Sequence, residues 1–129
     1  MRKTILILSL IIMSGCGVQA SNTGIYVDQS YSEHLSSQFT LTKACTGLPQ
    51  GNFEDLLIIV MPQSFPCMEG KSLCAGQFRT PNIVKLGDVW SWNHEVVHYL
   101  LYENSGDLDP SHTSTLFREC GVPQRESKK

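Results

Sequence analysis

The sequence carries little positive charge and has no basic cluster of the kind that binds nucleic acid. Ten Lys and Arg residues stand against twelve Asp and Glu residues in 129 positions, and two of the ten are Arg2 and Lys3. The one remaining basic grouping, at residues 125–129, is typical of a solvated tail. We therefore expect no nucleic-acid partner.

The chain also lacks an apolar run long enough to cross a membrane, which takes roughly 20 residues. The run at residues 4–13 is shorter, follows the basic start and ends in Ser14-Gly15-Cys16. This predicts a signal peptide over residues 1–15. The Ser-Gly-Cys ending resembles the lipobox of bacterial lipoproteins, in which the cysteine becomes the lipidated first residue. The alternative is an ordinary secretory signal cut near Gln19-Ala20.

The lipobox resemblance implies that Cys16 carries acyl chains and attaches the protein to a membrane of the bacterial cell envelope. Gly17 follows, and under the sorting rule of these lipoproteins a residue other than Asp there implies the outer membrane, facing the periplasm. Residues 16–29 would then form a tether with a short strand at 24–28. The oligomeric state has no signature in the sequence.

The length leaves no room for two domains, and there is no internal repeat or low-complexity segment. We expect one domain over residues 30–122, followed by a flexible tail at 123–129. A capping-box pattern and an apolar stripe predict an amphipathic helix at 30–45. Apolar runs predict a buried strand at 56–61 and a second strand at 81–86, with irregular structure at 62–80. The fold class expected is α+β.

The five cysteines lack the C-x2-to-4-C spacing of structural zinc sites, which argues against zinc binding by thiols. Setting Cys16 aside leaves an even set, as expected for disulfides in an oxidising compartment. Three pairings are possible. We favour Cys67 with Cys74 across a short loop, and Cys45 with Cys120 joining the first helix to the C-terminal segment.

The most informative stretch is Trp92-Asn93-His94-Glu95-Val96-Val97-His98, an HExxH pattern in a segment that ends at Gly106. Residues four apart on a helix lie one above the other, so His94 and His98 can bind one metal ion. Glu95 lies about 100° round the helix from His94, where it can act as a base without being a ligand. His112 follows a Gly-Asp-x-Asp-Pro turn that can fold it back as a third ligand.

These residues resemble the zincin metallopeptidases, whose active-site helix carries HExxH. The wider pattern Trp92-x-His94-Glu95-x-x-His98, Gly106-Asp107-x-Asp109-Pro110-x-His112-x-Ser114 and Phe117-x-x-Cys120 is similar to a group of small lipoproteins of bacteria and their phages. The resemblance implies a zincin-like fold, zinc held by the three histidines, and Glu95 as general base for hydrolysis of a peptide or protein substrate.

The sequence lacks the HExxHxxGxxH spacing of metzincins and has no recognisable Met-turn. Three carboxylates therefore remain alternatives to His112 as third ligand. Glu119 would act as in gluzincins, and Asp107 or Asp109 as in aspartate-type sites. Asp109 can otherwise orient a ligating histidine from outside the metal's own ligand set. A different class of function is also open, namely a non-catalytic envelope lipoprotein with a structural or vestigial zinc site.

Overall fold

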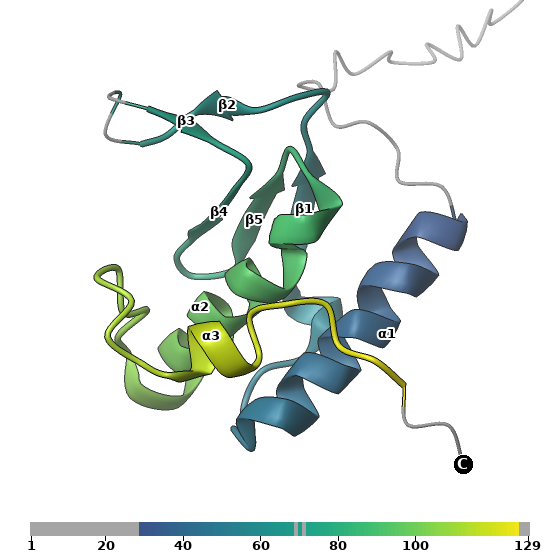
Figure 1. Ribbon diagram of the computed structural model, residues 1–129, viewed down its shortest axis with the longest axis vertical. Helices are drawn as coiled ribbons and strands as arrows, with labels where there is room; N and C mark the ends of the chain where they lie inside the picture. Colours follow the sequence, from purple (N-terminus) through teal and green to yellow (C-terminus); the bar gives the residue numbers. More distant parts are fainter. Residues whose placement is uncertain (1–28, 69, 71, 127–129) are drawn as a thin grey trace, which may run out of the picture.

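The computed structural model describes residues 29–68, 70 and 72–126, which form a small α+β fold as the sequence predicts (Figure 1). The predicted signal peptide, Cys16 and the strand expected at 24–28 lie outside the described residues. The helices are α1 (Gln29–Thr46), α2 (Trp92–Ser105) and the short α3 (Leu116–Glu119), with 3-10 turns η1 (Phe53–Asp55) and η2 (Val89–Ser91). The strands are β1 (Leu57–Val60), β2 (Phe65–Pro66), β3 (Leu73–Cys74), β4 (Gly76–Arg79) and β5 (Ile83–Leu86).

The main sheet has three strands in the order β1-β5-β4. β1 runs parallel to the central β5, with Ile58 opposite Val84, whereas β4 runs antiparallel to β5, with Phe78 opposite the same valine. β2 and β3 form a separate antiparallel hairpin, which extends away from the three helices (Figure 1). β4 is therefore an edge strand, and α2 packs beside it.

The core lies between α1, α2 and the sheet. The predicted stripe of α1 is its buried face, with Leu35, Phe39 and Thr42 all 4% exposed or less. Trp92 opens α2, is fully buried, and donates its indole N–H to the Leu35 carbonyl at 2.9 Å. This bond fixes the two helices against each other and sets the orientation of α2.

Two predictions about the strands are wrong. Residues 62–80 are not irregular, because they hold β2, β3 and β4. These strands are too short to show an alternating pattern, and they form through pairing with β5 and with each other. The run at 56–61 gives a strand, but β1 is at the edge of the sheet, and Leu57 is 55% exposed instead of buried.

Both favoured disulfides are confirmed. Cys67–Cys74 closes the β2–β3 hairpin, and Cys45–Cys120 joins the end of α1 to the residue after α3. Beyond it the chain lies along α1 (Figure 1), where Gln124 N–H donates to the Gln38 side chain at 2.9 Å. We expected a flexible tail from residue 123, and contacts with α1 reach as far as Glu126, which accepts from the Ser37 hydroxyl. Among the described helices, none has the length and apolar character needed to span a bilayer.

Candidate metal centre

α2 brings His94, Glu95 and His98 to one cleft. The turn η2 leads into this helix, and Asp88 caps that turn by accepting from Trp90 N–H at 2.9 Å. Ser91 is at the N-cap position of α2 but makes no capping bond with its side chain. The helix ends at Gly106, whose left-handed φ of 76° lets its N–H bond the Tyr102 carbonyl. Glycine adopts this conformation without strain, and the chain then turns back along the helix.

The returning loop places His112 beside the helix and is held by Asp109. One carboxylate oxygen of Asp109 accepts from the N–H and hydroxyl of Thr113, and the other accepts from Ser114 N–H at 2.7 Å. These bonds keep the pKa of Asp109 below its usual value. Asp109 and His112 both have positive φ, 52° and 55°, a conformation that few residues other than glycine adopt. The carboxylate therefore stabilises a strained turn that presents His112.

The three imidazoles converge through their Nε2 atoms. His112 Nε2 lies 3.0 Å from His94 Nε2 and 3.1 Å from His98 Nε2, and all three ligand atoms lie within 4.8 Å of one another. Ligand nitrogens about 2.0–2.1 Å from a tetrahedral zinc are roughly 3.3 Å apart, close to the two shorter distances. The residues present thus fit a divalent metal that imidazole binds.

A backbone carbonyl sets the tautomer of His98. Its Nδ1 is 2.6 Å from the Leu108 oxygen, which can only accept, so Nδ1 carries the proton and Nε2 is left with a lone pair for a metal. Burial lowers the pKa of His98. Burial also lowers the pKa of His94, and the charges of His98 and His112 act in the same direction, which brings this pKa to about 4. Both rings are thus neutral near pH 7, as ligands must be.

Glu95 is 5% exposed and is attached to the edge strand. Its Oε2 accepts from Phe78 N–H at 2.7 Å. Its Oε1 lies beside Gly76, where a Cβ atom would come within 2.8 Å of this oxygen. Burial raises the pKa of Glu95 to about 7, and the Phe78 hydrogen bond acts in the opposite direction.

The carboxylates considered as alternative ligands lie outside this histidine cluster. Asp107 accepts from Asp109 N–H at 2.8 Å, and Asp109 is bonded to Thr113 and Ser114. Glu119 is 3.9 Å from Arg118 and exposed. Among the described residues, the metal-capable group consists of His94, His98 and His112. His34, the fourth histidine, is exposed on α1.

Two contributors to the site were missed by sequence reasoning. The Leu108 carbonyl is a backbone group, so no residue type marks it. Phe117 is 9% exposed, and its ring centroid lies 4.5–5.0 Å from the centroids of all three imidazoles. Its recurrence in the Phe117-x-x-Cys120 pattern was the available signal.

The cluster opens into a cleft of about 470 Å³. Its other walls are the edge strand β4, the Cys67–Cys74 disulfide with Met68, and the loop residues Leu108 and Pro110. Tyr99 is instead buried in the core, where its hydroxyl bonds the Asn52 carbonyl at 3.3 Å. Tyr99 and Tyr102 are not among the residues that line the cleft, and both pack on Phe78.

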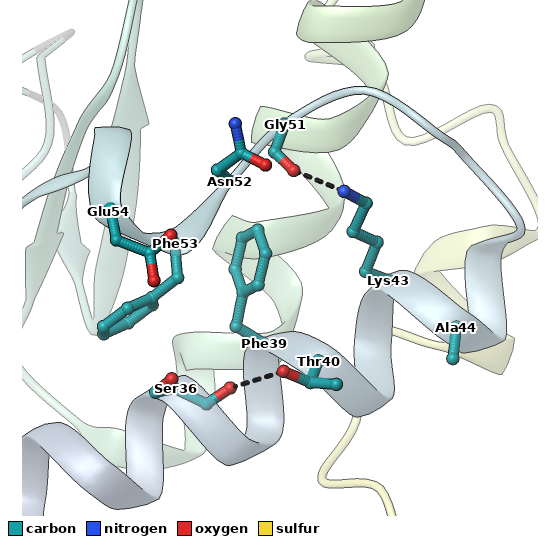
Figure 2. Close-up of a pocket in the computed structure, with 9 residues that line it drawn as sticks. All are labelled: Ser36, Phe39, Thr40, Lys43, Ala44, Gly51, Asn52, Phe53 and Glu54. Carbon is teal, nitrogen blue, oxygen red and sulfur yellow. Dashed lines mark hydrogen bonds between the residues drawn. The ribbon is translucent and has the colours of Figure 1, made fainter.

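A second cavity of about 420 Å³ lies between α1 and residues 51–54 (Figure 2). Its lysine, Lys43, donates to the Gly51 carbonyl at 2.6 Å. The described residues that line it include no histidine or cysteine. It therefore offers no cluster of reactive groups comparable to the histidine cleft.

No family model, no curated protein and no solved structure matches this chain. The case for a function therefore depends on the geometry of the cleft.

Proposed function

We propose that the protein is an exported zinc-dependent hydrolase with a zincin-like fold, acting as a metallopeptidase anchored to a membrane. The observation that carries this proposal is the convergence of three imidazole Nε2 atoms in one cleft with the carboxylate of Glu95. A structural zinc site is closed by four protein ligands, whereas catalytic sites keep three and one open position. The cluster has three ligands among the described residues and adjoins an open cleft.

His94, His98 and His112 would hold the zinc ion. Bound there, zinc would supply a Lewis acid that polarises a carbonyl and lowers the pKa of water. Glu95 would accept a proton from the attacking water and deliver it to the leaving amine. Because Oε2 is occupied by Phe78 N–H, we assign the proton transfer to Oε1.

One structural feature favours a peptide over other substrates. β4 is an edge strand, and its residues Gly76, Gln77 and Phe78 line the cleft beside Glu95. Glu95 already accepts from Phe78 N–H, and an extended peptide can pair with the backbone groups of this edge that remain free.

Membrane attachment through acylated Cys16 belongs to the same proposal. The other four cysteines are paired in two disulfides, which leaves Cys16 as the odd one in the count of five. Two disulfides also fit an oxidising compartment such as the periplasm.

Metal analysis of the full chain, purified in detergent, tests the metal site. We expect about one zinc per chain, with His94→Ala, His98→Ala and His112→Ala each losing it. His34→Ala is the matched control, because this exposed histidine is outside the cluster, and it should keep the metal. The proposal would be overturned by a wild-type chain that contains no zinc and whose stability is the same with and without added zinc. Zinc with a fourth protein ligand would instead support the non-catalytic lipoprotein.

A further inference from the structure

One phenyl ring touches all three candidate metal ligands. The centroid of Phe117 lies 5.0 Å from that of His94, 4.5 Å from that of His98 and 4.7 Å from that of His112. The ring planes are inclined to one another by 43–71°. Phe117 thus forms an apolar wall against which the three imidazoles pack.

Few other contacts hold two of these rings. His98 is oriented by the Leu108 carbonyl. In residues 29–68, 70 and 72–126, the hydrogen bonds of the His94 and His112 side chains are those within the cluster. His112 is also exposed and comes from a loop. Apart from the contacts that the three imidazoles make with one another, packing on Phe117 therefore constrains the orientation of these two rings.

The helix that carries Phe117 is itself held from outside. α3 has four residues, too few for a stable helix on its own hydrogen bonds. Cys120 follows it, is 1% exposed, and is bonded covalently to Cys45 at the end of α1. Val97 of α2 packs with Phe117 and Cys120 in one buried cluster. The disulfide thus links α1 to the support of the metal ligands.

We propose that Phe117 is a positioning residue for the three imidazoles and that the Cys45–Cys120 disulfide holds it in place. Metal affinity would then depend on Phe117 and on this disulfide, and not on Cys67–Cys74. The proposal rests on the metal-binding part of the proposed function and is independent of hydrolysis. Apolar groups around a site also control access of solvent to the metal.

The decisive test compares Phe117→Leu with Phe39→Leu in the full chain. Phe39 is 4% exposed and packs on Phe53 and Tyr99 in the main core, so it controls for the general effect of losing a buried phenyl ring. Binding of Co²⁺ is followed by its visible absorption, which reports ligand geometry. We expect Phe117→Leu to bind about 10–100-fold more weakly with an altered spectrum. Phe39→Leu should match wild type in both.

The disulfides provide a second comparison. Replacing Cys45 and Cys120 by Ser should weaken Co²⁺ binding, whereas replacing Cys67 and Cys74 should not, although that pair also lines the cleft. Circular dichroism checks that each variant is folded. If the Cys45/Cys120 variant is unfolded, the comparison of Phe117→Leu with Phe39→Leu tests the inference by itself. Equal affinity and spectrum for Phe117→Leu and Phe39→Leu would overturn the inference. A wild-type chain that binds no Co²⁺ would overturn the proposed function, and this inference with it.

Discussion

Glu95 on α2 is hydrogen-bonded to the backbone of the edge strand, because Phe78 N–H donates to its Oε2 at 2.7 Å. The carboxylate of the proposed base is therefore positioned by the sheet as well as by its own helix. This bond also satisfies a backbone donor that faces away from β5. Substitutions of Glu95 should therefore affect stability through Oε2, which accepts from Phe78 N–H, and hydrolysis through Oε1, to which we assign the proton transfer.

Glu95→Gln should separate the two effects. The amide oxygen of glutamine can still accept from Phe78 N–H, so the free energy of unfolding should change by less than about 1 kcal/mol. Hydrolysis of an unstructured peptide mixture should fall by at least about 100-fold, because the base is lost, while zinc stays bound. Glu95→Leu leaves the N–H without an acceptor and should be about 1–3 kcal/mol less stable than the Gln variant in urea unfolding. Full activity of Glu95→Gln would show that Glu95 is not the base.

Gly76→Ala should impair hydrolysis without removing zinc. A Cβ there would clash with Ser91 Oγ and lie 2.8 Å from Glu95 Oε1, so both side chains must move. Overpacking of this kind costs about 1–3 kcal/mol, which urea unfolding measures. Ser91→Ala removes one of the two clashing groups. Gly76→Ala should therefore cost less stability in the Ser91→Ala background than in the wild-type chain, whereas hydrolysis should stay impaired. A fully active Gly76→Ala variant would contradict the assigned position of Oε1.

Asp109→Asn should weaken zinc binding although Asp109 is not in the histidine cluster. One carboxylate oxygen becomes an NH₂ group that faces the donors of either Thr113 or Ser114, which loosens the turn that presents His112. We expect a loss of about 10–100-fold in affinity, measured by competition with a chelator. Asp107→Asn is the control, since its amide oxygen can still accept from Asp109 N–H. Loss of an oxygen ligand in the X-ray absorption spectrum of Asp109→Asn would identify Asp109 as a ligand instead.

Cys16→Ser should release the protein from the membrane fraction while leaving both disulfides intact. Its thiol is outside the two pairs, and multiple acyl chains are needed for stable anchoring. Fractionation and mass spectrometry of the N-terminal peptide provide the measurement. Mature wild-type protein that begins at Ser21 without an acyl group would show that an ordinary secretory signal is present.

The parts of the site that the sequence predicted are those governed by spacing along one element. His94 and His98 converge because a helix brings residues four apart together, and Gly106 allows the turn toward His112. The disulfides were predictable because four cysteines allow few pairings and one pair closes a short loop.

The unpredicted parts depend on contacts between distant elements. β4 has no alternating pattern, and its role depends on pairing with β5 and on a backbone N–H that any residue except proline would provide. Phe117 acts through the position of a four-residue helix that has no periodicity to detect. The sequence does not distinguish the burial of Trp90 from that of Trp92, whereas in the structure the turn η2 leaves Trp90 70% exposed and Trp92 is buried.

The parallel pairing of β1 with β5 has a consequence for how the cleft can vary. Parallel neighbours need a long connection, and here that connection contains the β2–β3 hairpin, whose disulfide lines the cleft. Doubling the length of a flexible loop costs only about 0.6 kcal/mol. Insertions or replacements in the hairpin can therefore change what the cleft admits while β1, β5 and α2 keep their pairing and packing. If the protein is the proposed hydrolase, substrate preference would in this way diverge during evolution without changing the residues that position the histidines.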